Sequence, residues 1–341
     1  MAEPKDDLDQ YPIAETGDLV EQVPVIDVGA IVDDAESPAA LDAVQRIAAA
    51  ASEWGFFQIV NHGIADTLID DTWRETANFF AQPADVKDAI MRTRENPWGY
   101  YNSELTKNQR DKKEVFDYTT DGVDPIYESE NRWPAIDDGF RRTMCAYRDS
   151  VTDLSLALLR AFCVGLDLPA EFMQADFERG HTGFIRLNYY PVDDPLAASN
   201  IEQLPVADLG VHHHTDAGAL TVLLQDDVGG LQVFRDGYWY SIEPTPGAFV
   251  INTGDMMQVW SNDVYQAAVH RVLAMERHDR YSIPFFFNPT ADTRVSPLPS
   301  VVSDDRPARY KTINWSEFRG KRTDGDYADY GPEVQIAQYR I

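Results

Sequence analysis

Histidine and aspartate residues with the spacing of a metal site stand out in this 341-residue chain. Only seven histidines occur, yet three of them are consecutive in the segment GVHHHTDAGALT. Side chains two positions apart on a strand share a face, so His212, His214 and Asp216 are expected to project together, while His213 points away. His270 lies in another strand-like run, AAVHRV. Two imidazoles and one carboxylate on neighbouring strands form a facial triad with open coordination positions, which suits non-haem iron(II).

An arginine follows His270 by ten residues, within the apolar run RYSIPFFF. Arg280 and Ser282 are two positions apart and therefore share a face of the predicted strand. A guanidinium beside a hydroxyl can bind a carboxylate through several hydrogen bonds. Because an arginine inside an apolar strand needs an anionic partner, we expect either a bound carboxylate or an ion pair with one of the 57 acidic residues.

Two other metal sites share part of this pattern. His212 and His214 resemble the first half of a cupin site, but the glutamate that usually follows is absent, since residues 217–220 are Ala, Gly, Ala and Leu. A zinc hydrolase would use similar ligands with a general base, and would leave Arg280 and Ser282 without a role. His212 and His213 are interpreted as polar residues of a strand end. The remaining histidines are expected to be structural: His62, His181 and His278.

The elements that position these residues are predicted from hydrophobic periodicity. Seven short strand-like runs separated by turn residues predict one all-β sandwich or barrel over about 180–290. These runs begin at residues 184, 219, 231, 238, 248, 267 and 280. Helices are expected at 39–53, 65–80, about 139–165 and 307–318, and short strands from Val23 and from Phe56. The part before the core looks too poor in strands to fold alone, so two independent domains are not expected.

Composition excludes several classes of protein. The chain has 29 basic and 57 acidic residues, a formal net charge of −28, which argues against binding nucleic acid or an anionic membrane surface. We interpret this acidity as favouring solubility, as in a saline cytoplasm. Two cysteines rule out a disulfide framework, and no apolar run approaches the ~18 residues of a membrane span. With an N-terminus that lacks an apolar leader, this predicts a soluble cytoplasmic protein.

Several motifs together resemble one family. They are GVHHHTDAGALTVLLQDDVGGLQV, the later His270, RYSIPFFFNP, VPVIDV from Val23, WGFFQIVNHGI from Trp54, NYYP from Asn188 and PARYKTINWSEF from Pro307. Here His270 follows Asp216 by 54 residues and Arg280 follows His270 by 10. The order H-x-D, H, R-x-S is similar to that of the iron- and 2-oxoglutarate-dependent oxygenase family, in its isopenicillin-N-synthase-like branch. The resemblance covers the chain from about residue 23 onward.

This resemblance implies a mixed α+β fold with a double-stranded β-helix (jelly-roll) core. The implied organisation is a loose arm over 1–22, a helical region packed on the core over 23–179, the catalytic core over 180–290 and a C-terminal segment with a closing helix over 291–341. The implied iron(II) ligands are His214, Asp216 and His270. The distal carboxylate of 2-oxoglutarate would bind Arg280 and Ser282, helped by Asn188 and Tyr190.

A substrate pocket is also implied by the resemblance, bordered by Tyr100, Tyr101 and Phe116. Phe286 should face the same side of its strand as Arg280. For all four aromatic residues, core packing is the alternative. The basic run Lys107, Arg110, Lys112 and Lys113 is interpreted as a solvated helix face, with a surface for an anionic substrate as the alternative.

The implied reaction is the oxidation, most commonly hydroxylation, of a small molecule by O2, with release of succinate and CO2 from 2-oxoglutarate. Ascorbate is a candidate reductant, and no obligate protein partner is indicated. An oxidase of the same branch that needs no 2-oxoglutarate, and forms rings or double bonds, is the alternative, because such enzymes share the R-x-S pair. A catalytically silent binding module is a more remote alternative, since such proteins commonly lose a ligand.

Overall fold

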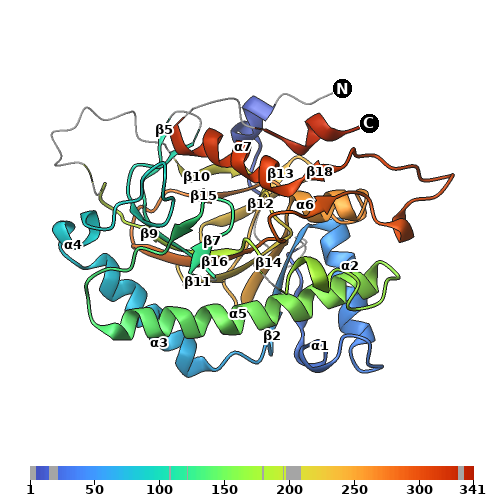
Figure 1. Ribbon diagram of the computed structural model, residues 1–341, viewed down its shortest axis with the longest axis horizontal. Coiled ribbons are helices and arrows are strands. Elements are labelled where there is room, and N and C mark those ends of the chain that lie inside the picture. Colours follow the sequence, from blue (N-terminus) through green and yellow to red (C-terminus); the bar gives the residue numbers. More distant parts are fainter. Residues whose placement is uncertain are drawn as a thin grey trace.

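The computed structural model describes residues 5–14, 22–106, 109–120, 122–178, 180–194, 196, 209–328 and 334–341. Two sheets form the centre of the molecule, and helices cover them on the outside (Figure 1). The larger sheet has eight strands in the order β1-β2-β14-β11-β16-β9-β6-β3. Its strands are β1 (Val25–Asp27), β2 (Phe56–Val60), β3 (Gly99–Tyr101), β6 (Glu114–Thr119), β9 (Phe184–Tyr190), β11 (Leu220–Gln225), β14 (Phe249–Thr253) and β16 (Arg280–Phe287).

The smaller sheet has four strands in the order β10-β15-β12-β13. They are β10 (Leu209–His214), β12 (Leu231–Arg235), β13 (Tyr238–Ser241) and β15 (His270–Leu273). All its pairings are antiparallel, and only β1 and β2 pair in parallel in the larger sheet. The strand-like runs predicted after residue 180 all form strands, and together they make the expected double-stranded β-helix. Short hairpins lie outside it: β4 (Leu105–Thr106) with β5 (Gln109–Arg110), β7 (Val123–Asp124) with β8 (Ser129–Glu130), and β17 (Arg294–Val295) with β18 (Ile313–Asn314).

Helices cover the larger sheet, and the longest, α5, crosses the lower part of the view in Figure 1. The helices are α1 (Gly29–Asp33), α2 (Leu41–Glu53), α3 (Asp66–Phe80), α4 (Ala84–Asp88), α5 (Asp138–Gly165), α6 (Asp255–Trp260) and α7 (Trp315–Ala328). α5 begins where the side chain of Asp137 accepts a hydrogen bond from the amide of Gly139. Its predicted apolar stripe, including Met144, Val151 and Leu158, is buried in the main core. The predicted positions of α2, α3 and α5 are therefore confirmed.

The N-terminal part contributes more strand than its sequence predicts. β1 and β2 confirm the strands predicted from Val23 and Phe56, but β3 and β6 were not predicted. All four belong to the larger sheet, so the expectation of a strand-poor region that only packs on the core is incomplete. The arm is also not wholly loose, because residues 5–10 form a short 3-10 helix and Ile13 forms a bridge to Trp239 of β13. Residues 1–4 and 15–21 lie outside the described residues. The domain boundaries themselves stay a prediction.

The closing helix begins at Trp315, not at Pro307 as predicted. The side chain of Asn262 holds the preceding segment in place, since it donates to the carbonyl of Pro307 and accepts from the amide of Arg309. The helix then starts after Asn314, whose side-chain oxygen accepts from the amide of Glu317. This is the bond of a helix-capping residue, which fixes the start of the helix there.

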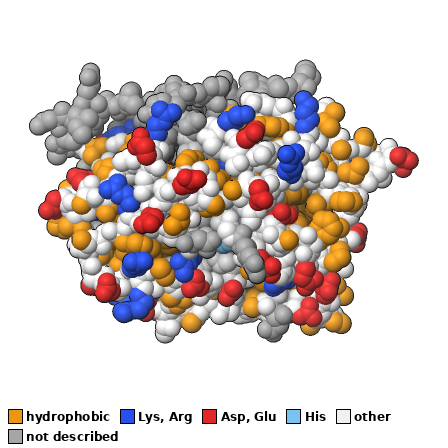
Figure 2. All heavy atoms as spheres, viewed as in Figure 1, with side chains coloured by type: hydrophobic (Ala, Val, Ile, Leu, Met, Phe, Trp, Pro, Cys, Tyr) orange, Lys and Arg blue, Asp and Glu red, His pale blue; other side chains and the backbone are white. Residues whose placement is uncertain are grey.

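The surface shows acidic and basic side chains mixed with apolar ones, without one dominant patch on the face drawn in Figure 2. Within the described residues, no helix combines the length and the apolar character that a membrane crossing requires.

Candidate active site

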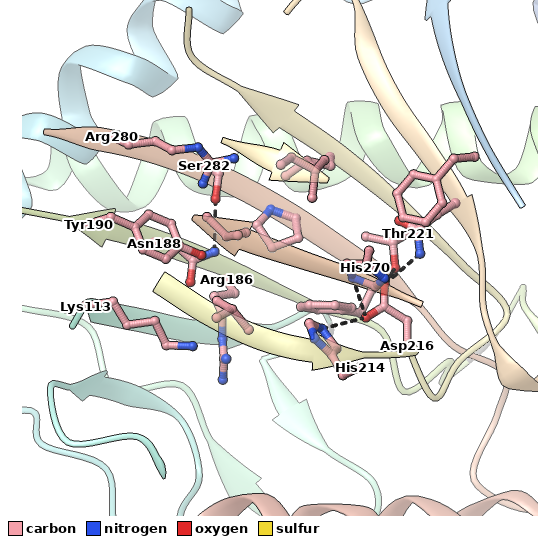
Figure 3. Close-up of a pocket in the computed structure, with 18 residues that line it drawn as sticks. Lys113, Arg186, Asn188, Tyr190, His214, Asp216, Thr221, His270, Arg280 and Ser282 are labelled. Atoms are coloured by element: carbon pink, nitrogen blue, oxygen red, sulfur yellow. Dashed lines mark hydrogen bonds and ion pairs between the residues drawn. The ribbon is translucent and has the colours of Figure 1, made fainter. Parts of the chain in front are cut away.

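A cavity between the two sheets contains the residues singled out by the sequence (Figure 3). Its empty space is about 570 Å³, open mouth included. The lining residues are Phe56, Lys113, Arg186, Asn188, Tyr190, Val211, His214, Asp216, Thr221, Leu223, Leu231, Asn252, His270, Val272, Arg280, Ser282, Pro284 and Phe286. The cavity therefore joins the predicted metal ligands to the predicted carboxylate-binding pair.

His214, Asp216 and His270 meet at one end of the cavity. Each offers a ligand atom, and these atoms all lie within 4.8 Å of one another. Oδ1 of Asp216 lies 3.6 Å from Nε2 of His214 and 3.7 Å from Nε2 of His270. The two histidines face each other because β10 and β15 are antiparallel neighbours and pair these residues directly. One ion could therefore contact two imidazoles and a carboxylate, the ligand set of a non-haem iron(II) site.

Backbone carbonyls hold the two imidazoles in the orientation that metal binding needs. Nδ1 of His214 lies 2.8 Å from the carbonyl oxygen of His212, and Nδ1 of His270 lies 3.2 Å from that of Ala268. Because a carbonyl oxygen only accepts, each Nδ1 must carry the hydrogen, which leaves the Nε2 lone pair directed at the site.

Asp216 is held by its other oxygen. Oδ2 accepts hydrogen bonds from the hydroxyl of Thr221 at 2.5 Å and from the amide of Asn252 at 2.8 Å. Thr221 and Asn252 are paired neighbours on β11 and β14, so the larger sheet fixes a ligand that follows β10 of the smaller sheet. Oδ1 is thereby directed towards the two histidines (Figure 3).

The protonation states of these groups suit metal binding. Burial, followed by the neighbouring His270, lowers the pKa of His214 to about 3, so its ring is neutral at physiological pH. Burial raises the pKa of Asp216. The neighbouring His270 and His214 and the hydrogen bonds from Asn252 and Thr221 lower this pKa by more than burial raises it, so the net shift is downward. A neutral imidazole and an ionised carboxylate are the forms that bind metals.

The other end of the cavity contains a buried arginine without a complete set of partners. Arg280 is 1% exposed, and its Nε and Nη1 have no hydrogen-bond partner among the described residues. Its guanidinium carbon lies 5.1 Å from the ring centre of Tyr190, and Asn188 donates to the hydroxyl of Ser282 at 3.3 Å. Arg280 pairs with Tyr190, and Ser282 with Asn188, across β16 and β9. A ligand carboxylate would satisfy the buried N–H groups, so the residues fit 2-oxoglutarate.

Of the four aromatic residues predicted to border the substrate pocket, one lines the cavity and three do not. Phe286 lines the cavity as expected, two residues beyond Pro284. Tyr100 and Phe116 lie instead in the main hydrophobic core, where Phe116 is 0% exposed, and Tyr101 packs against the guanidinium of Arg92. For Tyr100 and Phe116 the alternative, core packing, is what the structure shows. None of Tyr100, Tyr101 and Phe116 lines the cavity.

The predicted basic run does not form a solvated helix face. Arg110 ends the short strand β5, and Lys113 precedes β6; both are buried. Lys113 lines the cavity and its Nζ lies 2.8 Å from Glu104 and 3.0 Å from Asp111. Lys112 donates to the carbonyl of Val192, and Lys107 lies outside the described residues. The acids around Lys113 explain how a cation is tolerated there, since buried charges are stable only when paired.

Three polar lining residues were not predicted from the sequence: Arg186, Thr221 and Asn252. Arg186 was detectable, because it is two residues before Asn188 on β9 and must share its face. Thr221 and Asn252 each interrupt an apolar strand, which is a signal for a bonded polar group. Arg186 contacts Asp117 at 2.8 Å and Glu104 at 2.9 Å, so it belongs to the same network of charges as Lys113.

The other histidines lie outside the site. His62 and His181 are buried and hydrogen-bonded to the backbone of Gly247 and Gly183, and His278 is exposed, as expected of structural residues. His212 does not line the cavity beside His214, although the alternation of a regular strand would place it there. The reason is an irregularity in the pairing of β10 between Val211 and His214, which shifts the alternation of faces.

Comparisons with known proteins agree with this geometry. The 2OG-Fe(II) oxygenase superfamily matches residues 181–289, and the family described as non-haem dioxygenase in morphine synthesis N-terminal matches residues 23–136. Protein DMR6-LIKE OXYGENASE 2 of Arabidopsis thaliana is 33% identical over 295 residues, which cover 84% of this chain and 80% of that protein. The chain belongs to the iron(II)- and 2-oxoglutarate-dependent oxygenase family. Flavonol synthase 1 of Crocosmia x crocosmiiflora is 31% identical over 278 residues, 81% of each protein.

Solved structures share the fold over most of this chain. The crystal structure of JOX2 in complex with 2OG, Fe and JA has a TM-score of 0.78 at 26% identity, covering 98% of this chain and 93% of that one. A full-length Neurospora crassa protein, solved in complex with alpha-KG and thymine, has a TM-score of 0.77 at 26% identity, covering 89% and 97%. This oxygenase is therefore a non-haem dioxygenase that uses iron(II), 2-oxoglutarate and O2, and the predicted family and fold are confirmed.

Proposed function

We propose that this oxygenase hydroxylates a small organic molecule in the cavity between its sheets, with His214, Asp216 and His270 as the iron(II) ligands. The observation that carries the proposal is the placement of both groups in one cavity. Three convergent ligand atoms lie at one end, and at the other lie N–H groups of Arg280 that have no partner among the described residues. Arg280 and Ser282 bind the distal carboxylate of 2-oxoglutarate, and Asn188 and Tyr190 support them.

The chain's own residues bind, orient and shield the reactants. When bound with 2-oxoglutarate, iron(II) supplies the oxidising chemistry, in which O2 gives one oxygen atom to succinate, with loss of CO2, and one to the substrate. Arg280 orients 2-oxoglutarate, because it binds the carboxylate that lies far from the metal ligands. Apolar side chains from both sheets, including Phe56, Leu231 and Phe286, limit the access of water to the reacting groups.

The substrate is a small molecule that meets both apolar and charged walls. Structurally similar proteins bind different molecules, since JOX2 was solved in complex with JA and the Neurospora crassa protein in complex with thymine. In this chain, Lys113 and Arg186 supply the polar part of the wall. The two free cysteines, Cys145 and Cys163, support a reducing compartment such as the cytoplasm.

Succinate formation tests the proposal. Purified protein with iron(II) and O2 is incubated with and without 2-oxoglutarate, and succinate is measured in the absence of any added substrate, where slow uncoupled turnover is expected. Omission of iron(II) should abolish it. A protein that consumes O2 with a substrate, yet never forms succinate, would contradict dependence on 2-oxoglutarate.

The oxidase alternative has one specific observation in its favour. 1-Aminocyclopropane-1-carboxylate oxidase 5 of Arabidopsis thaliana is 31% identical over 283 residues, 81% of this chain and 87% of that protein. An oxidase would use Arg280 and Ser282 for a different carboxylate. The same assay separates the two proposals, because only the first requires 2-oxoglutarate for turnover.

A further inference from the structure

Residues 8–14, here called the N-terminal strap, pack on the smaller sheet at its β13 edge. The indole nitrogen of Trp239 donates to the carbonyl of Leu8 at 2.9 Å. The backbone of Trp239 also bonds to the strap in both directions, donating to Pro12 at 2.9 Å and accepting from Ala14 at 2.8 Å. Ile13 forms a parallel bridge with Trp239, which is 0% exposed. The strap is therefore a bonded part of the sheet.

One side chain of the strap reaches the two strands that carry the histidine ligands. Oδ1 of Asp9 lies 3.3 Å from Nδ1 of His213 and 3.1 Å from Nη1 of Arg271. His213 immediately precedes His214 on β10, and Arg271 immediately follows His270 on β15. Neither His213 nor Arg271 lines the cavity, whereas His214 and His270 do, so Asp9 joins the two strands on the side away from the cavity.

The bridge lies where the two strands are least regularly paired. The register of β10 against β15 shifts between Leu209 and Val211 and again between Val211 and His214. An irregular ladder restrains its strands less than a continuous one. Arg271 extends the contact, because its Nε donates to Gln232 of β12 at 3.0 Å and its guanidinium carbon lies 4.1 Å from the ring centre of Trp239 on β13. The carboxylate of Asp9 thus contacts two of the four strands directly and the other two through Arg271.

We propose that Asp9 is a positioning residue for the iron site, which fixes His214 relative to His270 by joining β10 and β15 from outside. The inference rests on the proposed function, because it assumes that these histidines bind iron(II). Asp9 touches neither metal nor substrate, so its effect is confined to the geometry of the ligands. Its side chain is 44% exposed, so its removal should leave the fold intact and change metal binding moderately.

The test uses the full chain and three variants. Asp9→Ala removes the bridge, Asp9→Glu keeps a carboxylate, and Asp71→Ala is the matched control. Asp71 is an acid of similar exposure, 48%, that pairs with Arg74 on α3. Iron(II) affinity is measured anaerobically by competition with a chelator, and cobalt(II) absorption bands report the ligand geometry. Thermal unfolding of the metal-free proteins checks the fold.

Asp9→Ala is expected to weaken iron(II) binding about threefold to tenfold and to change the cobalt(II) spectrum. This is less than the roughly tenfold to hundredfold effect of groups bonded directly to a metal ligand, because Asp9 acts through the neighbouring residues. Asp9→Glu should recover part of the affinity, and Asp71→Ala should match the wild type. Equal affinity and an unchanged spectrum in Asp9→Ala, with iron bound normally by the wild type, would overturn this inference alone. Failure of the wild type to bind iron would overturn the proposed function as well.

Discussion

The two ends of the cavity differ in how completely their polar groups are bonded before any ligand arrives. At the metal end, each predicted ligand has a partner that orients it: carbonyls for His214 and His270, and Thr221 and Asn252 for Asp216. At the far end, Nε and Nη1 of Arg280 are buried without a partner in the described part of the chain.

The two ends differ because a metal and a carboxylate need different preparation of the groups that bind them. A metal site needs ligands fixed in advance, because their mutual geometry selects the ion. A carboxylate site instead keeps N–H groups unpaired, and the cost of that burial is relieved when the ligand binds, which favours binding.

The largest effect is expected from removing a metal ligand. His214→Ala, Asp216→Ala and His270→Ala should each abolish iron binding and activity while leaving the fold largely intact, since each loses one of three donors. Iron content after anaerobic reconstitution and circular dichroism provide the measurements. His278→Ala, at an exposed position, is the control and should bind iron normally. Full activity in any ligand variant would refute the assignment of that residue.

A smaller effect is expected at the arginine end. Arg280→Lys should raise the KM for 2-oxoglutarate about tenfold or more, because lysine cannot make the planar two-point contact with a carboxylate. Iron binding should be unchanged, which would separate the two ends experimentally. Arg277→Lys, at an exposed position four residues after Leu273, serves as the control. An unchanged KM would favour the oxidase alternative.

Loosening one orienting contact should have a moderate effect at the metal end. Thr221→Val removes the hydroxyl that donates to Asp216 while keeping the shape of the side chain, and should weaken iron binding about tenfold. Thr152→Val, which removes a hydroxyl bonded to the carbonyl of Arg148 on α5, is the matched control. If both variants bind iron as tightly as the wild type, the ligands do not depend on prior orientation.

The smallest effect concerns the pH dependence of the metal-free protein. The pKa of His214 is lowered from 6.5 to about 3 by burial and by His270, so the unfolded chain binds a proton that the folded chain does not between these values. The free energy of unfolding should therefore fall as the pH falls below 6.5, by at most about 1.4 kcal/mol per pH unit. The decrease should be smaller than this limit, because the side chain of His214 is 32% exposed. Urea unfolding at pH 7 and pH 5 measures this.

The comparison for that experiment is His214→Gln, which lacks the titrating ring. Its stability should depend less steeply on pH over the same interval. Identical pH dependence in the two proteins would show that His214 is not held neutral by the fold.

The metal ligands could be predicted from the sequence because the chemistry fixes their types and spacing. In the N-terminal part, β1 and β2 were also predicted, but β3 and β6 could not be. β6 carries Glu114 and Asp117, which makes it look like exposed chain, yet all six of its residues are buried. Its charges are satisfied by distant residues, Lys87 at 2.6 Å from Glu114 and Arg186 at 2.8 Å from Asp117. Partners so far apart in the sequence leave no local pattern.

The docked strap was missed for a related reason. Its attachment depends on Trp239 and Arg271, more than two hundred residues later in the chain. Periodicity describes a segment's own faces and does not identify a remote indole that binds it. Arg186 and Asn252, by contrast, carry a local signal, because Arg186 is two residues before Asn188 on its strand and Asn252 interrupts an apolar strand.

The order of strands in the larger sheet affects how the protein is made. β2 ends at Val60, but its neighbour β14 begins only at Phe249, and β11 lies on the other side of β14. During translation, β1 and β2 therefore leave the ribosome long before the strand that connects them to the rest of the sheet. Chains interrupted before Phe249 would present an unpaired apolar edge, so their recognition by chaperones should depend strongly on nascent-chain length.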